Sequence, residues 1–184
     1  MLRNLSTLTL VFILCFQAQV SFAQRGMRVF KPAHYQYGKT SVVKSFEVDS
    51  RGGVFKVSDT GSPLDGVVIS VPAGAVLAGR TIELSVGYDT GSLVHINSGT
   101  AGDFTMVLAT KERAEAVFQV PINITVPFKN KNVDTVTPLP YFINNKGAIS
   151  PAQLLSIDRT NKTFSFCTFH TGIYAWIDDD LRNN

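Results

Sequence analysis

Apolar and polar residues alternate along most of this chain, which is the period of a half-buried β-strand. The longest alternating run covers residues 118–126. Its apolar positions are Phe118, Val120, Ile122, Ile124 and Val126, and its intervening positions are Gln119, Pro121, Asn123 and Thr125. Shorter runs of the same kind recur at 67–71, 81–86, 104–108, 139–143, 164–166 and 173–177. We predict a strand for each run.

Stretches rich in Gly, Asn, Asp and Ser separate these runs and are typical of turns. They fall at 50–53, 58–66, 88–92, 97–103, 144–147 and 158–163. Short strands with one apolar face bury those faces by packing one sheet on another. The sequence therefore predicts an all-β protein with an antiparallel β-sandwich.

Two local features modify this picture. Pro121 and Pro127 cannot donate ladder hydrogen bonds, so their strand is expected to lie at a sheet edge or to contain a bulge. Residues 110–116 are the best helix candidate, but the segment is too short to be stable as an isolated helix.

The N-terminus has the three parts of a cleaved secretory signal peptide. The positive charge of Arg3 precedes an apolar run at 5–16, and the small residues Ser21 and Ala23 precede the expected cleavage point. Since a bilayer span requires about 20 apolar residues, we predict no stable membrane span. The pattern predicts a secreted or periplasmic protein.

We divide the chain into four parts on this basis. They are a signal peptide at 1–23, an N-terminal arm at 24–50 that can add an edge strand, a sandwich domain at 51–178 and a polar tail at 179–184.

Charge and cysteine content restrict the possible partners. Cleavage after Ala23 leaves 161 residues with 16 basic and 14 acidic side chains, because Arg3 is the charged residue that is removed. So small an excess does not favour nucleic-acid binding. Cys15 leaves with the signal peptide, so Cys167 has no disulfide partner within the chain, and we expect it to be buried and inert.

The segment from Gly52 to Tyr88 resembles the start of a ZU5-like domain. Gly52-Gly53 fits the opening strand of that family, residues 71–75 fit its "I-P-x-G-A" corner, and Ile82 and Leu84 fit the strand that follows. Residues 118–128 are similar to its "F-x-x-P-V-x-I-x-x-P-Y" strand, and residues 138–177 to its closing hairpins. The resemblance covers roughly 52–177 and implies a ZU5-like, immunoglobulin-like sandwich that contacts another protein.

The corner itself is explained by its residue types. Pro72 fixes φ and stops the preceding strand, Gly74 adopts backbone angles that other residues resist, and Ala75 is small enough to fit under the turn. The corner lacks the glycine spacing and the lysine of a phosphate-binding loop. We therefore interpret Pro72, Gly74 and Ala75 as a structural corner.

His170 and Thr171 are the candidates for covalent chemistry. The resemblance implies self-cleavage as an alternative, because some related extracellular proteins cut themselves at a His-x-Ser/Thr sequence in a strained turn. Here Thr171 follows the histidine directly and Gly172 occupies the second position, which departs from that pattern. The favoured interpretation is that His170 packs at the start of the last strand and bonds a backbone carbonyl.

No other constellation of residues indicates a catalytic, cofactor or metal site. His34 and His95 are far apart in the sequence, and zinc requires three or four converging ligands. The aspartates at 178–180 are interpreted as a solvated charge run. The tripeptides that begin at Asn123 and Asn161 have the glycosylation pattern, which matters only in a eukaryotic secretory route, and we do not count them as sites.

Tyr141, Tyr174 and Trp176 are the candidate surface-contact residues. Alternation places Tyr174 and Trp176 on one face of their strand, and exposed aromatic side chains can bind proteins or sugars. The favoured interpretation is that these rings cover the N-terminal arm, which carries its own tyrosines.

Together, these patterns predict a non-catalytic exported module for protein–protein interaction or structural support in the cell envelope or extracellular space. The alternatives are self-cleavage at His170–Thr171 and carbohydrate binding through outward-facing aromatic residues. The protein partner and the oligomeric state are left open.

Overall fold

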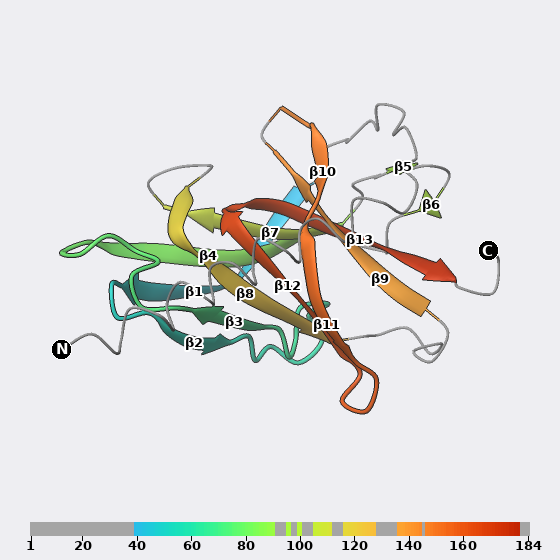
Figure 1. Cartoon of the computed structure of the whole chain (residues 1–184), viewed down its shortest axis with the longest axis horizontal. Helices are drawn as coiled ribbons and strands as arrows, with labels where there is room; N and C mark the ends of the chain where they lie inside the picture. The colour runs from blue at the N-terminus through green and yellow to red at the C-terminus, as the bar shows by residue number, and fades with distance from the viewer. Residues whose placement is uncertain are drawn as a thin grey trace, which may run out of the picture. The chain divides into compact units, whose positions relative to one another are not determined.

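The computed structural model describes residues 39–90, 95–96, 99–100, 105–111, 116–127, 136–144 and 146–180. The regular secondary structure of these residues consists of strands alone, and the paired strands are antiparallel. Two sheets enclose one apolar core, so the predicted all-β antiparallel sandwich is confirmed (Figure 1).

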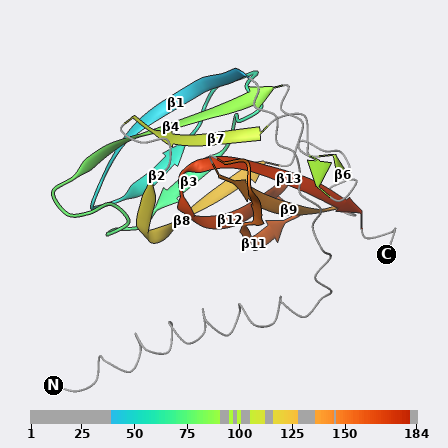
Figure 2. The same cartoon turned by 90° about the horizontal axis from the view of Figure 1, so that it is seen from above.

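The larger sheet contains six strands in the order β1-β4-β7-β13-β9-β10. Their bounds are Lys39–Asp49 (β1), Thr81–Thr90 (β4), Thr105–Thr110 (β7), Gly172–Asp180 (β13), Val136–Ile143 (β9) and Ile149–Pro151 (β10). Figure 2 shows β1, β4 and β7 on one side of the sandwich and β8, β12 and β11 on the other.

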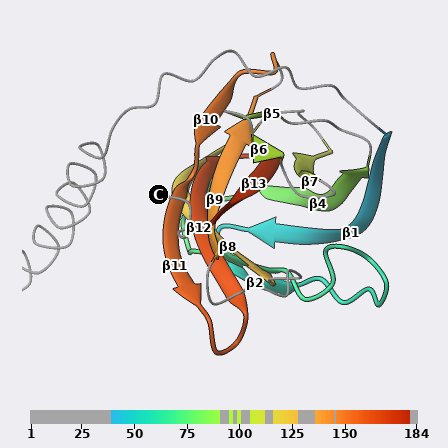
Figure 3. The same cartoon turned by 90° about the vertical axis from the view of Figure 1, so that its right-hand side faces the viewer.

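The smaller sheet contains five strands in the order β11-β12-β8-β3-β2. Their bounds are Gln153–Asp158 (β11), Thr163–His170 (β12), Val117–Pro127 (β8), Val68–Val71 (β3) and Gly53–Lys56 (β2). A separate pair of short strands joins His95–Ile96 (β5) to Gly99–Thr100 (β6). Figure 3 shows β11 and β12 on the side of the sandwich opposite β1.

Residue alternation determines which side chains enter the core. On β8, for example, Ile122 and Ile124 are fully buried, whereas Asn123 between them is exposed. Burying an aliphatic or aromatic side chain of this size contributes about 1.5–3 kcal/mol to folding. The largest fully buried side chains of the common core are Phe164, Phe166, Tyr174, Leu64, Ile69, Leu84, Met106, Leu108, Ile122 and Ile124.

Several chain connections cross from one sheet to the other. The segments between β1 and β2, between β3 and β4, and between β12 and β13 are of this kind. Such crossings bring residues that are distant in sequence together at the ends of the sandwich. The corner after β3 and the turn after β12 build the two candidate sites.

The sequence predicts an edge position or a bulge for the proline-containing strand, and the second alternative is the one found. β8 is internal, because it pairs with β12 on one side and with β3 on the other. The predicted irregularity is present: the β8–β12 register shifts between the Ile122 and Val117 pairings, and Pro121 lies within that interval. An internal strand tolerates Pro121 because regular pairing with β12 is interrupted there.

Two predicted domain boundaries also change. The edge strand expected from the arm is β1, which pairs with β4 from Lys39 to Asp49, so the sandwich begins before residue 51. At the other end, the aspartates at 178–180 pair with residues 136–138 of β9 and belong to β13 rather than to a tail. Backbone pairing requires no apolar side chains, so polar residues can extend a strand. A domain boundary that is predicted from the polarity of these residues therefore falls too early. Residues 112–115 of the predicted helix lie outside the described residues.

An ion pair closes the tight turn between β1 and β2. The backbone N–H and Nε of Arg51 donate to the Asp49 carboxylate at 2.8 and 2.9 Å, and Nη2 lies 2.7 Å from Oδ2. These hydrogen bonds hold the pKa of Asp49 below its ordinary value of 3.8. A carboxyl whose pKa is lower in the folded state stabilises the fold above its unfolded pKa, and that contribution is lost as the pH falls through the folded pKa.

We expect Asp49→Asn to lower the urea midpoint slightly at neutral pH, because this exposed pair is screened by water. The difference from wild type should vanish in acid, once Asp49 is protonated in both states. Asp158 also has a lowered pKa, caused by hydrogen bonds from Asn161, so the acid response of the wild type alone does not isolate Asp49. A midpoint difference that persists unchanged in acid would contradict this account.

Candidate functional site

Two of the three aromatic residues predicted at the surface are buried. Tyr174 is 0% exposed and lies in the core, with its ring centroid 5.3 Å from that of Phe166. Tyr141 is 7% exposed and belongs to a second apolar cluster with Ile143 and Ala175. The surface-contact prediction is therefore wrong for Tyr141 and Tyr174.

Trp176 is partly buried and packs against the same core as Tyr174. Its ring meets Phe164 edge-on, with the ring centroids 5.5 Å apart. Tyr174 and Trp176 do share a face of β13, as alternation predicts, but that face points inward. The platform of outward-facing rings needed for the carbohydrate-binding alternative is therefore not formed by these three residues.

Hydroxyl groups converge on the carbonyl oxygen of His170, at the end of β12. The Tyr174 hydroxyl donates to this oxygen, and Thr168 Oγ1 lies 3.3 Å from it. The two hydroxyl oxygens are 2.7 Å apart, and the His170 N–H donates to Thr168 Oγ1 at 3.0 Å. Donors aimed at a carbonyl oxygen polarise the carbonyl, which is one requirement of acyl chemistry.

The Thr171 hydroxyl, in contrast, has a structural partner. Thr171 is fully buried, and its Oγ1 accepts the N–H of Ala116 at 2.6 Å. Its own N–H donates to the Ala116 carbonyl oxygen at 2.9 Å. These two bonds anchor the β12–β13 turn to the residue that precedes β8.

His170 is the last residue of β12 rather than a part of β13. Its ring stacks on Phe142 with the centroids 5.5 Å apart, and its buried Nδ1 has no hydrogen-bond partner within the described segments. The predicted bond to a backbone carbonyl is thus not made by this nitrogen. Nδ1 does not bond the Thr171 hydroxyl either, so no base activates that hydroxyl through this atom.

We expect Tyr174→Phe to reduce the free energy of unfolding by about 1–3 kcal/mol, because it removes a buried donor to the His170 carbonyl. Urea denaturation followed by tryptophan fluorescence measures the change. Thr168→Val removes the other hydroxyl, and the double variant should show a coupling of at least about 0.5 kcal/mol between the two sites. Strictly additive effects would show that the two hydroxyls act independently.

The remaining candidate residues do not form a site in the described parts of the chain. Cys167 is half-buried rather than buried, and its Sγ lies 3.4 Å from Gln153 Oε1. Asn123 and Asn161 are exposed, and Asn161 Nδ2 donates to Asp158 at 2.7 Å. No three His, Cys, Asp or Glu side chains converge on a metal-sized position within these parts. His34 and the side chains of residues 95 and 178–180 lie outside them.

The corner at residues 72–75 has the geometry that its residue types predict. β3 ends at Val71, Gly74 has a φ of +81°, and Ala75 is 2% exposed. The Ala75 N–H donates to the Pro72 carbonyl oxygen at 3.1 Å, which closes the turn. The Gln119 N–H donates to the Ala75 carbonyl oxygen at 2.9 Å, so the corner is also fixed to β8.

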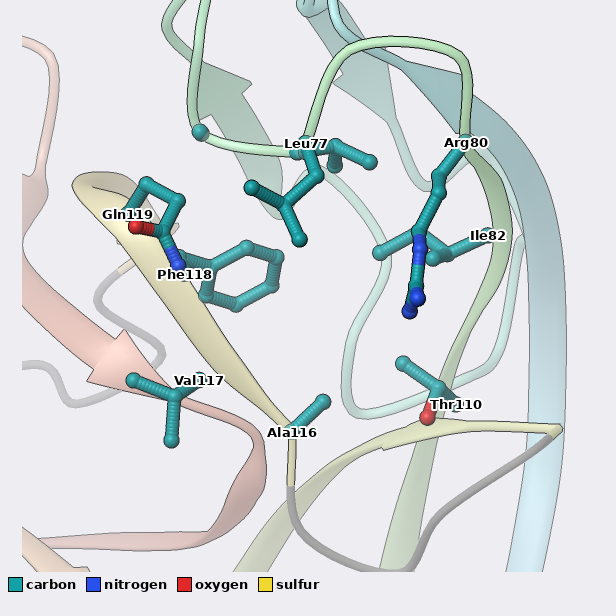
Figure 4. A pocket seen from close by; sticks show the side chains of 10 residues that line it. Leu77, Arg80, Ile82, Thr110, Ala116, Val117, Phe118 and Gln119 are labelled. Atoms are coloured by element: carbon teal, nitrogen blue, oxygen red, sulfur yellow. The ribbon is translucent and has the colours of Figure 1, made fainter.

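The chain beyond this corner forms one wall of a groove between the two sheets (Figure 4). The groove has a volume of about 300 Å³. Its lining comes from the corner and the turn after it, from the facing parts of β4 and β7, and from the start of β8: Ala75, Val76, Leu77, Arg80, Ile82, Thr110, Ala116, Val117, Phe118 and Gln119. We name this feature the corner groove.

The corner groove is lined mainly by apolar side chains, together with the neutral polar residues Thr110 and Gln119 and the charged residue Arg80. Figure 4 shows Leu77 and Phe118 on one side and Arg80 and Ile82 on the other, with the Arg80 guanidinium directed toward Thr110. Leu77 is 50% exposed and Val117 is 63% exposed, although both side chains are aliphatic. Sequence reasoning identified the corner but missed Leu77, Arg80 and Val117.

No protein-family model matches the chain, and no curated protein or solved structure is significantly similar to it. The resemblance to ZU5-like domains therefore remains a prediction from sequence. The described residues also include no helix that is long and apolar enough to cross a bilayer.

Proposed function

We propose that the chain is an exported, non-catalytic β-sandwich module that binds another protein in the cell envelope or the extracellular space. The observation that carries this proposal is the exposure of Leu77 and Val117 beside the corner groove. Exposed aliphatic side chains gathered around a hollow are typical of contact surfaces. The signal-peptide pattern supports export, and the ZU5-like resemblance supports a contact role by analogy.

Export is tested by fractionating cells that express the full-length chain and measuring the intact mass of the product. The expected result is one species of 161 residues that begins at Gln24 and is found in the periplasm or the medium. A product that retains residues 1–23 and stays in the cytoplasm would refute export.

Protein binding is tested by placing a photo-crosslinking amino acid at exposed positions in the native cells. Leu77 and Val117 report on the corner groove, and Val54, which is 72% exposed on β2, reports on a different surface. We expect at least one position to yield an adduct of discrete mass with another protein. If none of the three yields one, the interaction module is the wrong function.

Self-cleavage between His170 and Thr171 is a second candidate function, because two hydroxyl groups approach the His170 carbonyl oxygen. The intact-mass measurement tests it directly. Two fragments that meet at this bond, with a single species restored in Thr171→Val, would support self-cleavage. One uncut chain would eliminate it.

A further inference from the structure

The side chains that line the corner groove indicate which chemical groups a protein partner would present to it. Arg80 is its single charged lining residue among those described, and it forms no ion pair with any of them. Glu83, on the strand that follows Arg80, pairs instead with Lys111 at 3.6 Å. Among the described residues, therefore, no carboxylate neutralises this guanidinium, which lies beside apolar side chains.

The local backbone fixes the point from which the Arg80 side chain extends into the groove. The Arg80 N–H donates to the Leu77 carbonyl oxygen at 3.1 Å, and Gly79 adopts a φ of +76° within the same turn. This turn fixes the backbone of Leu77 relative to that of Arg80, so both side chains start from defined positions at the groove. An apolar group between them would contact Phe118 and Ile82, which both belong to or pack on the core.

The size of the groove limits what it can hold. A volume of about 300 Å³ is at the lower limit of pockets that enclose a drug-sized molecule. One apolar side chain of a protein fits such a space, and the exposed side chains of Leu77 and Val117 would contact the surrounding surface of the same partner. Buried apolar anchors of this kind carry much of the binding energy at protein interfaces.

We propose that the corner groove receives an apolar side chain of a protein partner, and that a carboxylate next to that side chain pairs with Arg80. This inference rests on the proposed protein-binding function and assigns it a surface and a partner chemistry. A planar guanidinium favours a carboxylate because it can donate two parallel hydrogen bonds. Arg80 therefore selects for an acidic side chain beside the anchor.

A matched set of three probes tests the recognition chemistry without knowledge of the partner. They are 4-phenylbutyrate, the neutral 4-phenylbutyramide and the cationic 4-phenylbutylamine, each titrated into the isotope-labelled protein expressed from the full-length sequence. We expect 4-phenylbutyrate to shift the backbone amide resonances of Ile82, Thr110 and Phe118 with a low-millimolar dissociation constant. The amide should bind about two- to fivefold more weakly, and the amine more weakly still.

Three variants assign the binding to the groove. Arg80→Gln should reduce the affinity for 4-phenylbutyrate to that for the amide and leave the amide unchanged. Leu77→Ser should weaken both probes. Arg159→Gln, in the turn between β11 and β12 and away from the groove, should change neither affinity. Equal binding of acid and amine, or no saturable shifts in these resonances, would overturn the proposal.

The crosslinking positions distinguish a failure of the groove as the docking site from a failure of the protein-binding function. Adducts from Leu77 and Val117 that are lost in Arg80→Gln support the groove as the docking site. An adduct from Val54 alone keeps the protein-binding function and overturns the groove as its site. The absence of adducts from all three positions overturns both.

Discussion

Phe166→Ala is expected to lower the free energy of unfolding by about 3–5 kcal/mol. Phe166 is fully buried in β12, with its ring centroid 6.2 Å from Phe164 and 5.3 Å from Tyr174. The substitution removes the apolar surface of the ring and leaves a cavity that the two rigid sheets fill only in part. Since a domain of this kind is stable by about 5–15 kcal/mol, the loss is a large fraction of the total. Urea denaturation followed by fluorescence measures it.

Phe169→Ala is the matched control, because it makes the same change on the same strand. Phe169 is 47% exposed, so its truncation should cost well under half as much as that of Phe166. Equal losses at the two positions would show that β12 does not lie between core and solvent in the described orientation. The two variants together thus test the direction of the strand's faces as well as the size of the effect.

The sandwich was predictable because alternation survives along its strands. On β3, Ile69 and Val71 are buried while Val68 and Ser70 are less so, which follows the period-two pattern. The same pattern on β12 buries Phe164, Phe166 and Thr168. A protein that must cover one face of each sheet keeps this period, and its sequence therefore carries the signal directly.

The inward direction of Tyr174 was not predictable from the same pattern. β13 is apolar on both faces, because Tyr174 enters the common core while Ala175 enters the second cluster with Tyr141 and Ile143. Alternation separates the two faces of such a strand but does not say which one meets the other sheet. The hydroxyl groups of Thr168 and Tyr174 bond each other, so the buried tyrosine has a polar partner that the spacing does not reveal.

The corner groove depends on contacts that are distant in sequence. Leu77 and Arg80 come from the turn after the corner, whereas Val117 and Phe118 come from the start of β8. The hydrogen bond from the Gln119 N–H to the Ala75 carbonyl oxygen brings the two segments together. No spacing rule links them, so the sequence indicated a structural corner but not the surface that this corner forms.

Gly52→Ala is expected to destabilise the protein by at least about 3 kcal/mol. Gly52 has a φ of +71°, a conformation that costs an L-residue about 1–2 kcal/mol. A Cβ at this position would also lie 2.1 Å from the carbonyl oxygen of Val71 and 2.8 Å from the carbonyl carbon of Pro72. Both neighbours are backbone atoms of the corner, so relief of the overlap requires the β1–β2 turn and the corner to move apart. Thermal or urea denaturation measures the loss.

Comparison with Gly79→Ala separates the steric part of this effect from the conformational part. The φ of Gly79, +76°, is close to that of Gly52, but a Cβ there would meet no atom within 4 Å. Gly79→Ala should therefore show only the conformational cost of about 1–2 kcal/mol, and the excess in Gly52→Ala measures the contact between the two turns. Equal losses would mean that Gly52 is required for its backbone angles alone. In that case the close packing of the β1–β2 turn against the corner would not contribute to stability.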